Sequence, residues 1–153
     1  MVDASPPRKQ LSTFIAKYDT KVARIARAAL IKMRKRLPGA VALIYDNYNA
    51  LAIAFGPSER VSEAVLSLAL YPRWVSLFFV RGADLPDPKG LLKGAGTRIR
   101  HIVLKGAADL DHPDIRVLMK LAMSLAPVRI VPSRRGKLVI KSISARQRPR
   151  RVV

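Results

Sequence analysis

Four apolar segments of strand length follow one another between Ala40 and Val80, and they limit the folds open to this chain. The segments are residues 41–45, 50–55, 65–70 and 74–80. Turn-forming residues separate them: Asp46 and Asn47, then Pro57, then Pro72. Because short connections of this kind join antiparallel neighbours, we predict an antiparallel sheet of about four to six strands. Residues 62–70 also fit a short helix, which is the alternative for the third segment.

Two amphipathic helices are expected to flank this sheet. Between residues 12 and 37, apolar side chains recur every three or four positions, and Pro38 with Gly39 ends the pattern. A second helix follows Asp111, with Asp114 as a capping partner and Pro113 in the first turn, and it ends at Pro127. The sequence therefore predicts an α+β fold with N-terminal and C-terminal helices packed on one antiparallel sheet.

A turn-rich stretch, residues 82–104, connects the sheet to the second helix. Pro86 and Pro88 prevent regular hydrogen bonding there, and Gly94 with Gly96 indicates a further turn. The alternating residues 98–104 then predict a half-exposed strand.

At 153 residues the chain is most simply one domain. We expect a flexible arm over residues 1–11, the α+β domain over residues 12–127 and a basic, partly mobile extension over residues 128–153. Within this extension, residues 129–131 and 137–143 are expected to form a hairpin, and the end of the chain is expected to be mobile.

Composition excludes some chemistry. The chain has no cysteine, which excludes disulfides, thiolate metal sites and cysteine nucleophiles. Its apolar runs are shorter than the roughly 20 residues of a membrane helix, so no membrane span is predicted. The first ten residues lack the apolar core of a secretory signal, and we expect a cytoplasmic protein.

The charge is unusual, with 29 Lys and Arg against 10 Asp and Glu, a net charge of +19. Such a surface attracts polyanions. One hypothesis is therefore nonspecific nucleic-acid binding through the first helix and the tail, whose candidate contacts are Lys17, Lys21, Arg24, Arg134, Arg135, Arg146, Arg148, Arg150 and Arg151. The alternative is that these residues only solvate the helix face and the tail.

Two other groups of residues are candidate binding sites. Donors and acceptors concentrate in the run Tyr45, Asp46, Asn47, Tyr48 and Asn49, which together with His101 would orient a small ligand. The glycine turn would offer backbone amides to an anion, with candidate residues Lys93, Gly94, Gly96, Arg98 and Arg100. The alternative for both groups is that they make turns. We expect the first group and the 82–100 loop to converge on one pocket if they bind a ligand.

No catalytic residues, cofactor or metal site are predicted. His101 is the best available general base, but no nucleophile-elbow motif is present. Asp109, Asp111, His112 and Asp114 would suit a divalent cation, yet Asp111 and Asp114 already have the capping role described above. The oligomeric state is left open.

Three motifs of the chain resemble a known family. They are YDNYNALAIAFGP, ALYPRWVSLFF and GADLPDPKGLLKGAGTRIRHI, and the resemblance covers about residues 12–125. The family is the YdhG-like domain-of-unknown-function family of bacterial cytoplasmic proteins. The resemblance implies a compact α+β fold, and some relatives are described as frataxin-like iron chaperones. Frataxin-like iron delivery uses an acidic surface, in contrast to the +19 charge here. The expectation is therefore a non-enzymatic binding module whose ligand is unknown, and iron handling, which the resemblance implies, is an alternative that the basic charge disfavours.

Overall fold

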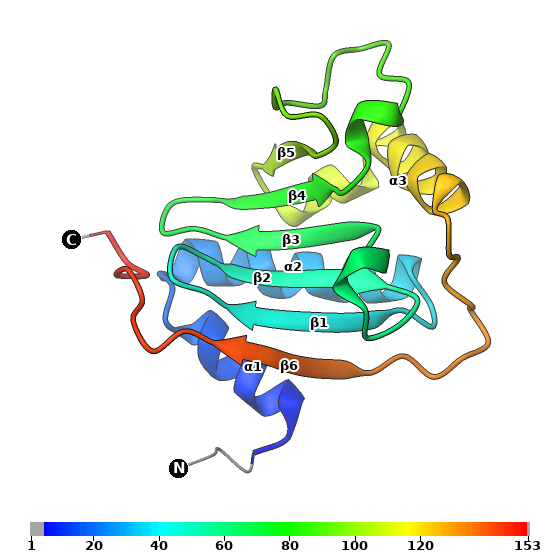
Figure 1. Ribbon diagram of the computed structural model, residues 1–153. Helices are drawn as coiled ribbons and strands as arrows, with labels where there is room; N and C mark the ends of the chain where they lie inside the picture. The colour runs from blue at the N-terminus through cyan, green and yellow to red at the C-terminus, as the bar shows by residue number, and fades with distance from the viewer. Residues whose placement is uncertain (1–4, 153) are drawn as a thin grey trace.

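The computed structural model describes residues 5–152. Over this range, six strands form one sheet in the order β5-β4-β3-β2-β1-β6, and the three α-helices lie behind it in the view of Figure 1. The strands are β1 (Val41–Asp46), β2 (Leu51–Gly56), β3 (Leu66–Leu70), β4 (Val75–Phe79), β5 (Arg100–Leu104) and β6 (Leu138–Ile143). The α+β prediction is confirmed.

The sheet is mixed, which corrects the prediction of a purely antiparallel one. Strands β1 to β5 pair antiparallel, but β6 pairs parallel with β1. The predicted hairpin of residues 129–131 with 137–143 is therefore wrong. The segment after the last helix crosses to the far edge of the sheet, where β1 still has an unpaired side (Figure 1).

The first helical region is two helices, α1 (Pro7–Ala16) and α2 (Thr20–Arg36), and not the single helix predicted. Asp19 causes the break, because it adopts an extended conformation and its side chain accepts from the backbone N–H of Val22 (2.9 Å), as an N-cap does. Since α1 begins at Pro7, the expected flexible arm does not extend to residue 11. Residues 1–4 of that arm lie outside the described range.

The C-terminal helix α3 (Pro113–Leu125) confirms the second helix, but its cap differs from the prediction. The Nδ1 atom of His112 accepts from the backbone N–H of Asp114 (3.2 Å). Asp111 instead accepts hydrogen bonds from Lys32 and Arg36 of α2. Three 3-10 turns, η1 (Val61–Glu63), η2 (Gly82–Asp84) and η3 (Ala107–Asp111), complete the part of the chain that the structure describes.

The helices cover one face of the sheet and form the main core with it. Large strand residues alternate onto this face, as the two-residue period of a strand requires. They are Leu51, Ile53 and Phe55 of β2, Leu66, Leu68 and Leu70 of β3, and Val75, Leu77 and Phe79 of β4. No helix within residues 5–152 is long and apolar enough to cross a membrane.

Candidate functional site

In the part of the chain that the structure describes, the opposite face of the sheet has no α-helix over it, and only the 3-10 turn η1 with its loop packs on one end, beside Leu43 and Ala54 (Figure 1). The residues of this face are small in the middle and large at the sides. Two rows of paired residues cross this face from β1 to β5. They read Tyr45, Ala52, Ala69, Ser76, Val103 and Leu43, Ala54, Ser67, Phe78, His101. Because β2 and β3 contribute only alanine and serine to these rows, the middle of the face is lower than its sides.

A groove of about 1260 Å³ results from this arrangement. Its floor includes Ala52, Ala54, Ser67 and Ala69, and Tyr45 and Phe78 stand on either side of it. From β1 to β4 the sheet spans three strand spacings, roughly 14 Å. The groove is thus wide enough for an extended ligand and is larger than a site for a single small group.

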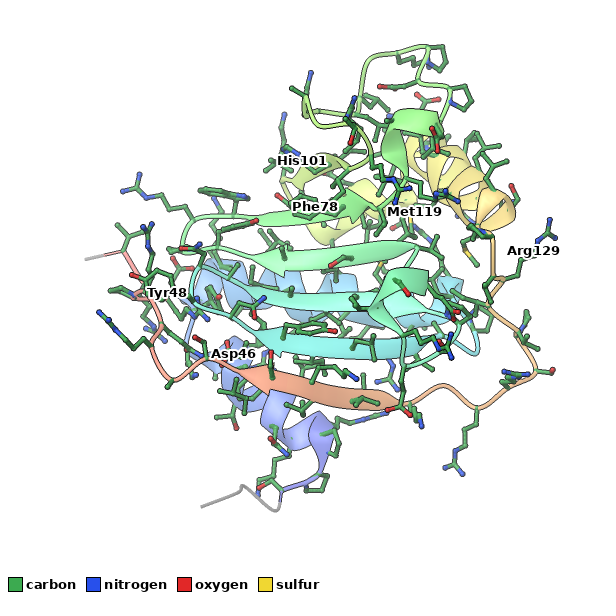
Figure 2. All side chains as sticks on the ribbon, in the orientation of Figure 1. Asp46, Tyr48, Phe78, His101, Met119 and Arg129 are labelled. Atoms are coloured by element: carbon green, nitrogen blue, oxygen red, sulfur yellow. The ribbon has the colours of Figure 1, made fainter. Side chains whose placement is uncertain are left out.

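Aromatic side chains surround the groove. Tyr71 and Trp74, on either side of the turn between β3 and β4, stack with ring centroids 4.8 Å apart. Tyr48 projects from the loop after β1, and Figure 2 shows it at one end of the sheet, with Phe78 farther along the face. Trp74 is 41% exposed and Tyr48 is 45% exposed. These exposed rings are available to stack on a planar ligand.

The end of the groove near Tyr48 is closed by residues 144–151, which we call the C-terminal strap. Ser144, Arg148 and Pro149 of the strap line the groove. The guanidinium of Arg148 lies over the ring of Tyr48, 5.6 Å from its centroid. The backbone N–H of Arg148 also donates to the carbonyl of Tyr48 (2.9 Å). A cation and an aromatic ring therefore occupy the same part of the groove wall.

A buried ion pair attaches the strap to the sheet. The Nη2 atom of Arg150 donates to Asp46 (3.0 Å), and their side chains are 4% and 0% exposed. Lys17 donates to the other carboxylate oxygen of Asp46 (3.0 Å). The ring of Tyr18 lies 5.6 Å below the Arg150 guanidinium, and burial raises the pKa of Tyr18 to about 12. These contacts fix the position of the strap and so of Arg148.

The predicted ligand cluster is divided between the two faces. Tyr45, Asn47, Tyr48 and Asn49 line the groove. Asp46, in contrast, is on the helix-covered side, where it holds Arg150 and Lys17. His101 is on the groove face but four strands away from Tyr45, beside Phe78, with ring centroids 5.3 Å apart.

Two basic side chains of the predicted anion site donate hydrogen bonds to backbone carbonyls of their own loop. Arg100 donates to the carbonyls of Gly96 (2.6 Å) and Ile99 (2.8 Å), and Lys93 donates to the carbonyl of Gly90 (3.4 Å). Gly94 has a φ of +123°, which suits glycine in a turn. Of the 82–100 loop, Ile99 reaches the groove, so the expected convergence with the Tyr45 region occurs at one residue.

The predicted nucleic-acid contacts fall into two classes. Three of these residues bind other parts of the protein. Lys17 and Arg150 pair with Asp46. Arg151 donates to the carbonyls of Lys17 (3.2 Å) and Ala16 (3.4 Å). Exposed positions are taken by Lys21 and Arg24 on α2, Arg134 and Arg135 in the loop before β6, and Arg146 and Arg148 in the strap. Of these, Arg148 lines the groove.

Three carboxylates that do not line the groove are paired with lysines. Hydrogen bonds from Lys32, Lys89 and Lys137 lower the pKa of Asp111, Asp114 and Glu59, respectively. Within residues 5–152 no three metal-binding side chains come together, the Asp109–Asp114 region included.

Sequence reasoning did not single out Tyr71, Trp74 or Phe78 as site residues. A signal for them was present, because β2 and β3 alternate large and small residues, and not apolar and charged ones. Large residues on one face and alanine or serine on the other indicate a sheet packed on one side only. The three aromatic residues on the uncovered side then become candidates for binding.

Comparisons with family models, curated proteins and solved structures found no match to this chain. The resemblance to the YdhG-like family therefore remains an expectation based on the three motifs.

Proposed function

We propose that this protein is a binding module that holds single-stranded nucleic acid in the groove on the helix-free face of its sheet. The observation that carries this proposal is the set of exposed aromatic side chains beside arginines on an open sheet face. Single-strand binders combine these two elements, because aromatic rings stack on bases while cations follow the backbone phosphates.

The aromatic residues supply the base contacts. Tyr48, Tyr71, Trp74 and Phe78 all line one groove, and with Tyr45 they include three of the four tyrosines and the one tryptophan of the chain. Every base has two π-faces, so stacking of this kind tolerates any sequence. Asn47 and Asn49 add amide donors and acceptors at the groove edge, where an unpaired base presents its hydrogen-bonding edge.

The arginines supply the phosphate contacts. Arg148 lines the groove, and three more exposed arginines are direct chain neighbours of lining residues: Arg60 beside Val61, Arg73 beside Trp74 and Arg98 beside Ile99. Among residues 5–152, no acidic side chain lines the groove. A net charge of +19 adds long-range attraction for a polyanion. If four phosphates are neutralised, log K falls with log salt at a slope of about −3.

This proposal moves the nucleic-acid contacts from the first helix to the sheet face. Lys17 and Arg150 already hold Asp46, which leaves them poorly available to phosphate. Lys21 and Arg24 are exposed but lack an aromatic groove beside them. A duplex hides the faces of its bases, so the groove favours a single strand over a duplex.

Fluorescence anisotropy with a labelled single strand of about 12 nucleotides tests the proposal. We expect Trp74→Ala to weaken binding by roughly 5- to 150-fold, because each stacked base contributes about 1–3 kcal/mol. A second variant, Ala69→Leu, fills the floor while leaving every aromatic residue in place, and it should weaken binding as well.

The control is the double variant Lys21→Ala/Arg24→Ala, which removes two positive charges from α2. This double variant should lower the affinity for the oligonucleotide only modestly, and only at low salt, where surface charges are least screened. If this control abolishes binding while Trp74→Ala and Ala69→Leu bind as the unmodified protein does, the nucleic-acid site is on the helices and the proposal is wrong.

A further inference from the structure

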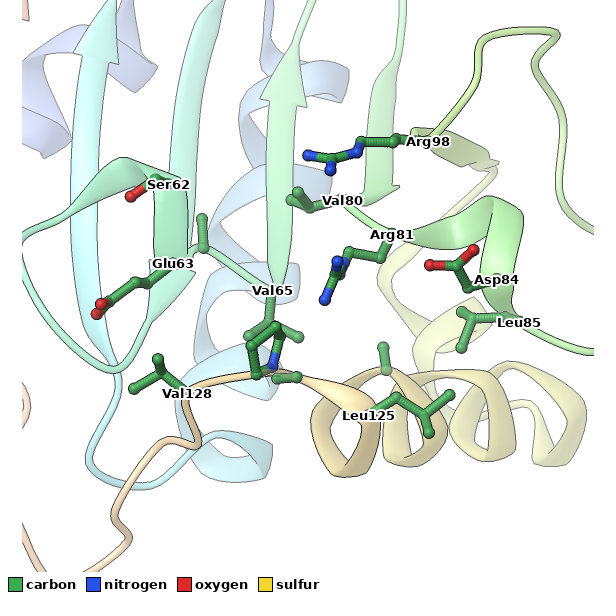
Figure 3. Close-up of a pocket in the computed structure, with 14 residues that line it drawn as sticks. Ser62, Glu63, Val65, Val80, Arg81, Asp84, Leu85, Arg98, Leu125 and Val128 are labelled. Carbon is green, nitrogen blue, oxygen red and sulfur yellow. The ribbon is translucent and has the colours of Figure 1, made fainter.

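A second, smaller cavity of about 170 Å³ adjoins the groove. Its apolar walls include Val65 before β3, Leu85 after η2 and Leu125 at the end of α3 (Figure 3). Ala64 and Val80 line both this cavity and the groove. The cavity is well below the 300–1,000 Å³ of a typical drug-sized ligand site, so it suits one small group at the end of a longer ligand.

Two guanidinium groups stand at this cavity. Figure 3 shows Arg81 and Arg98 extending from neighbouring segments toward the same side. Both are exposed, and within residues 5–152 neither side chain makes an ion pair or hydrogen bond with the protein. Two exposed, unpaired arginines on the same side of a cavity are suited to bind a phosphate.

The cavity also offers acceptors. Ser62, Glu63 and Asp84 line it, and Glu63 already accepts from the hydroxyl of Ser58 (2.6 Å). With two arginines and two carboxylates the lining is not simply a site for any anion. Its chemistry matches a group that has a phosphate, an apolar planar part and amino donors, which describes a nucleotide.

We infer that this cavity binds the terminal nucleotide of the strand held in the groove, an inference that rests on the proposed function. Arg81 and Arg98 contact the terminal phosphate, and the base enters the apolar interior. A terminal phosphate carries a charge of about −1.5 to −2, against −1 for an internal one, so two arginines favour it. The last turn of α3 and residues 126–128 form one wall of the cavity, and a volume of about 170 Å³ suits a single base and not a continuing strand.

Anisotropy titrations with three versions of one oligonucleotide test the inference: 5′-phosphorylated, 3′-phosphorylated and unphosphorylated. We expect one phosphorylated form to bind about tenfold more tightly than the unphosphorylated form. Arg81→Gln/Arg98→Gln should remove this preference while the unphosphorylated strand still binds. Removing the terminal base while keeping its phosphate should also lower the affinity.

The matched control is Arg116→Gln/Lys120→Gln, which removes two exposed charges from α3. It should keep the preference for the phosphorylated strand. An unmodified protein that binds all three strands equally, or a preference that survives in Arg81→Gln/Arg98→Gln, overturns the inference but leaves the groove proposal standing. Failure to bind any of the strands overturns both.

Discussion

The two faces of the sheet use the same strands in different ways. On the helix-covered face, β3 contributes Leu66, Leu68 and Leu70, all fully buried. On the helix-free face, the same strand contributes Ser67 and Ala69, which form part of the groove floor. The alternation thus separates the packed core from the groove within one strand, because large side chains on both faces would require a second layer of helices or sheet.

The C-terminal strap links the two faces. Asp46 points to the covered face, where it pairs with Arg150. Arg148, which precedes Arg150 by two residues, lines the groove on the open face. A residue with no contact to the groove therefore determines where the groove wall lies. Substitutions at the strap should therefore change both stability and binding, whereas substitutions on a single face of the sheet should change only one of the two.

The largest combined effect, on stability and on the position of the strap, is expected at this link. Arg150→Met leaves Asp46 buried with Lys17 as its remaining partner, and removing one member of a buried pair costs about 3–5 kcal/mol. Urea unfolding should show a loss near the lower end of this range, and trypsin should cut the strap faster.

The control is Arg146→Met, an exposed position in the same strap, which should change stability by no more than about 0.5 kcal/mol. Equal losses in the two variants would mean that the buried pair does not hold the strap.

A second comparison separates the faces directly. Leu68→Ala creates a cavity in the covered core and should cost about 2–5 kcal/mol, whereas Ser67→Ala on the open face should stay within about 0.5 kcal/mol. Urea unfolding of the two single variants measures both values. Similar losses would show that the open face contributes as much to the core as the covered one.

The smallest effect concerns Tyr18, whose hydroxyl donates to the carbonyl of Leu70 (2.9 Å) and accepts from the backbone N–H of Leu51 (3.1 Å). Tyr18→Phe should cost about 1–2 kcal/mol at neutral pH. Because burial raises its pKa to about 12 from about 10 in the unfolded chain, the folded state keeps a proton that the unfolded state loses.

Stability of the unmodified protein should therefore be unaffected by this group below pH 10 and fall between about pH 10 and 12, by on the order of 2 kcal/mol. Tyr18→Phe should lose stability less steeply over this range, and Tyr71, whose pKa burial also raises, remains in both proteins as an internal reference. Parallel pH profiles for the two proteins would contradict the assignment.

Local patterns predicted much of this fold. The periodicity of residues 41–80 and the turn residues between them were sufficient for strands β1 to β4, and Pro113 marked the start of α3. The break at Asp19 was missed because the apolar period continues through Tyr18, while the cap forms at a single residue. The parallel pairing of β6 depends on a contact between distant segments, which local sequence does not encode.

The site was predictable to a smaller degree. The cluster around Tyr45 was identified from composition, and four of its five members line the groove. Asp46 was grouped with them because neighbours in a loop cannot be assigned to a face, and its position follows from the strand register. The arginines of the tail could not be divided into structural and exposed ones, because Arg150 is buried only through the return of the strap to Asp46.

The fluorescence of Trp74 tests the central claim most directly, since it is the only tryptophan of the chain and lines the groove. Titration with a single-stranded oligonucleotide should quench this fluorescence in a saturable manner, because bases stack on the exposed indole, and the matching duplex should quench it far less at the same salt concentration. Anisotropy recorded on the same samples shows whether the strand is bound. Binding seen by anisotropy without any change in Trp74 fluorescence would contradict the claim that the helix-free face of the sheet holds the nucleic acid.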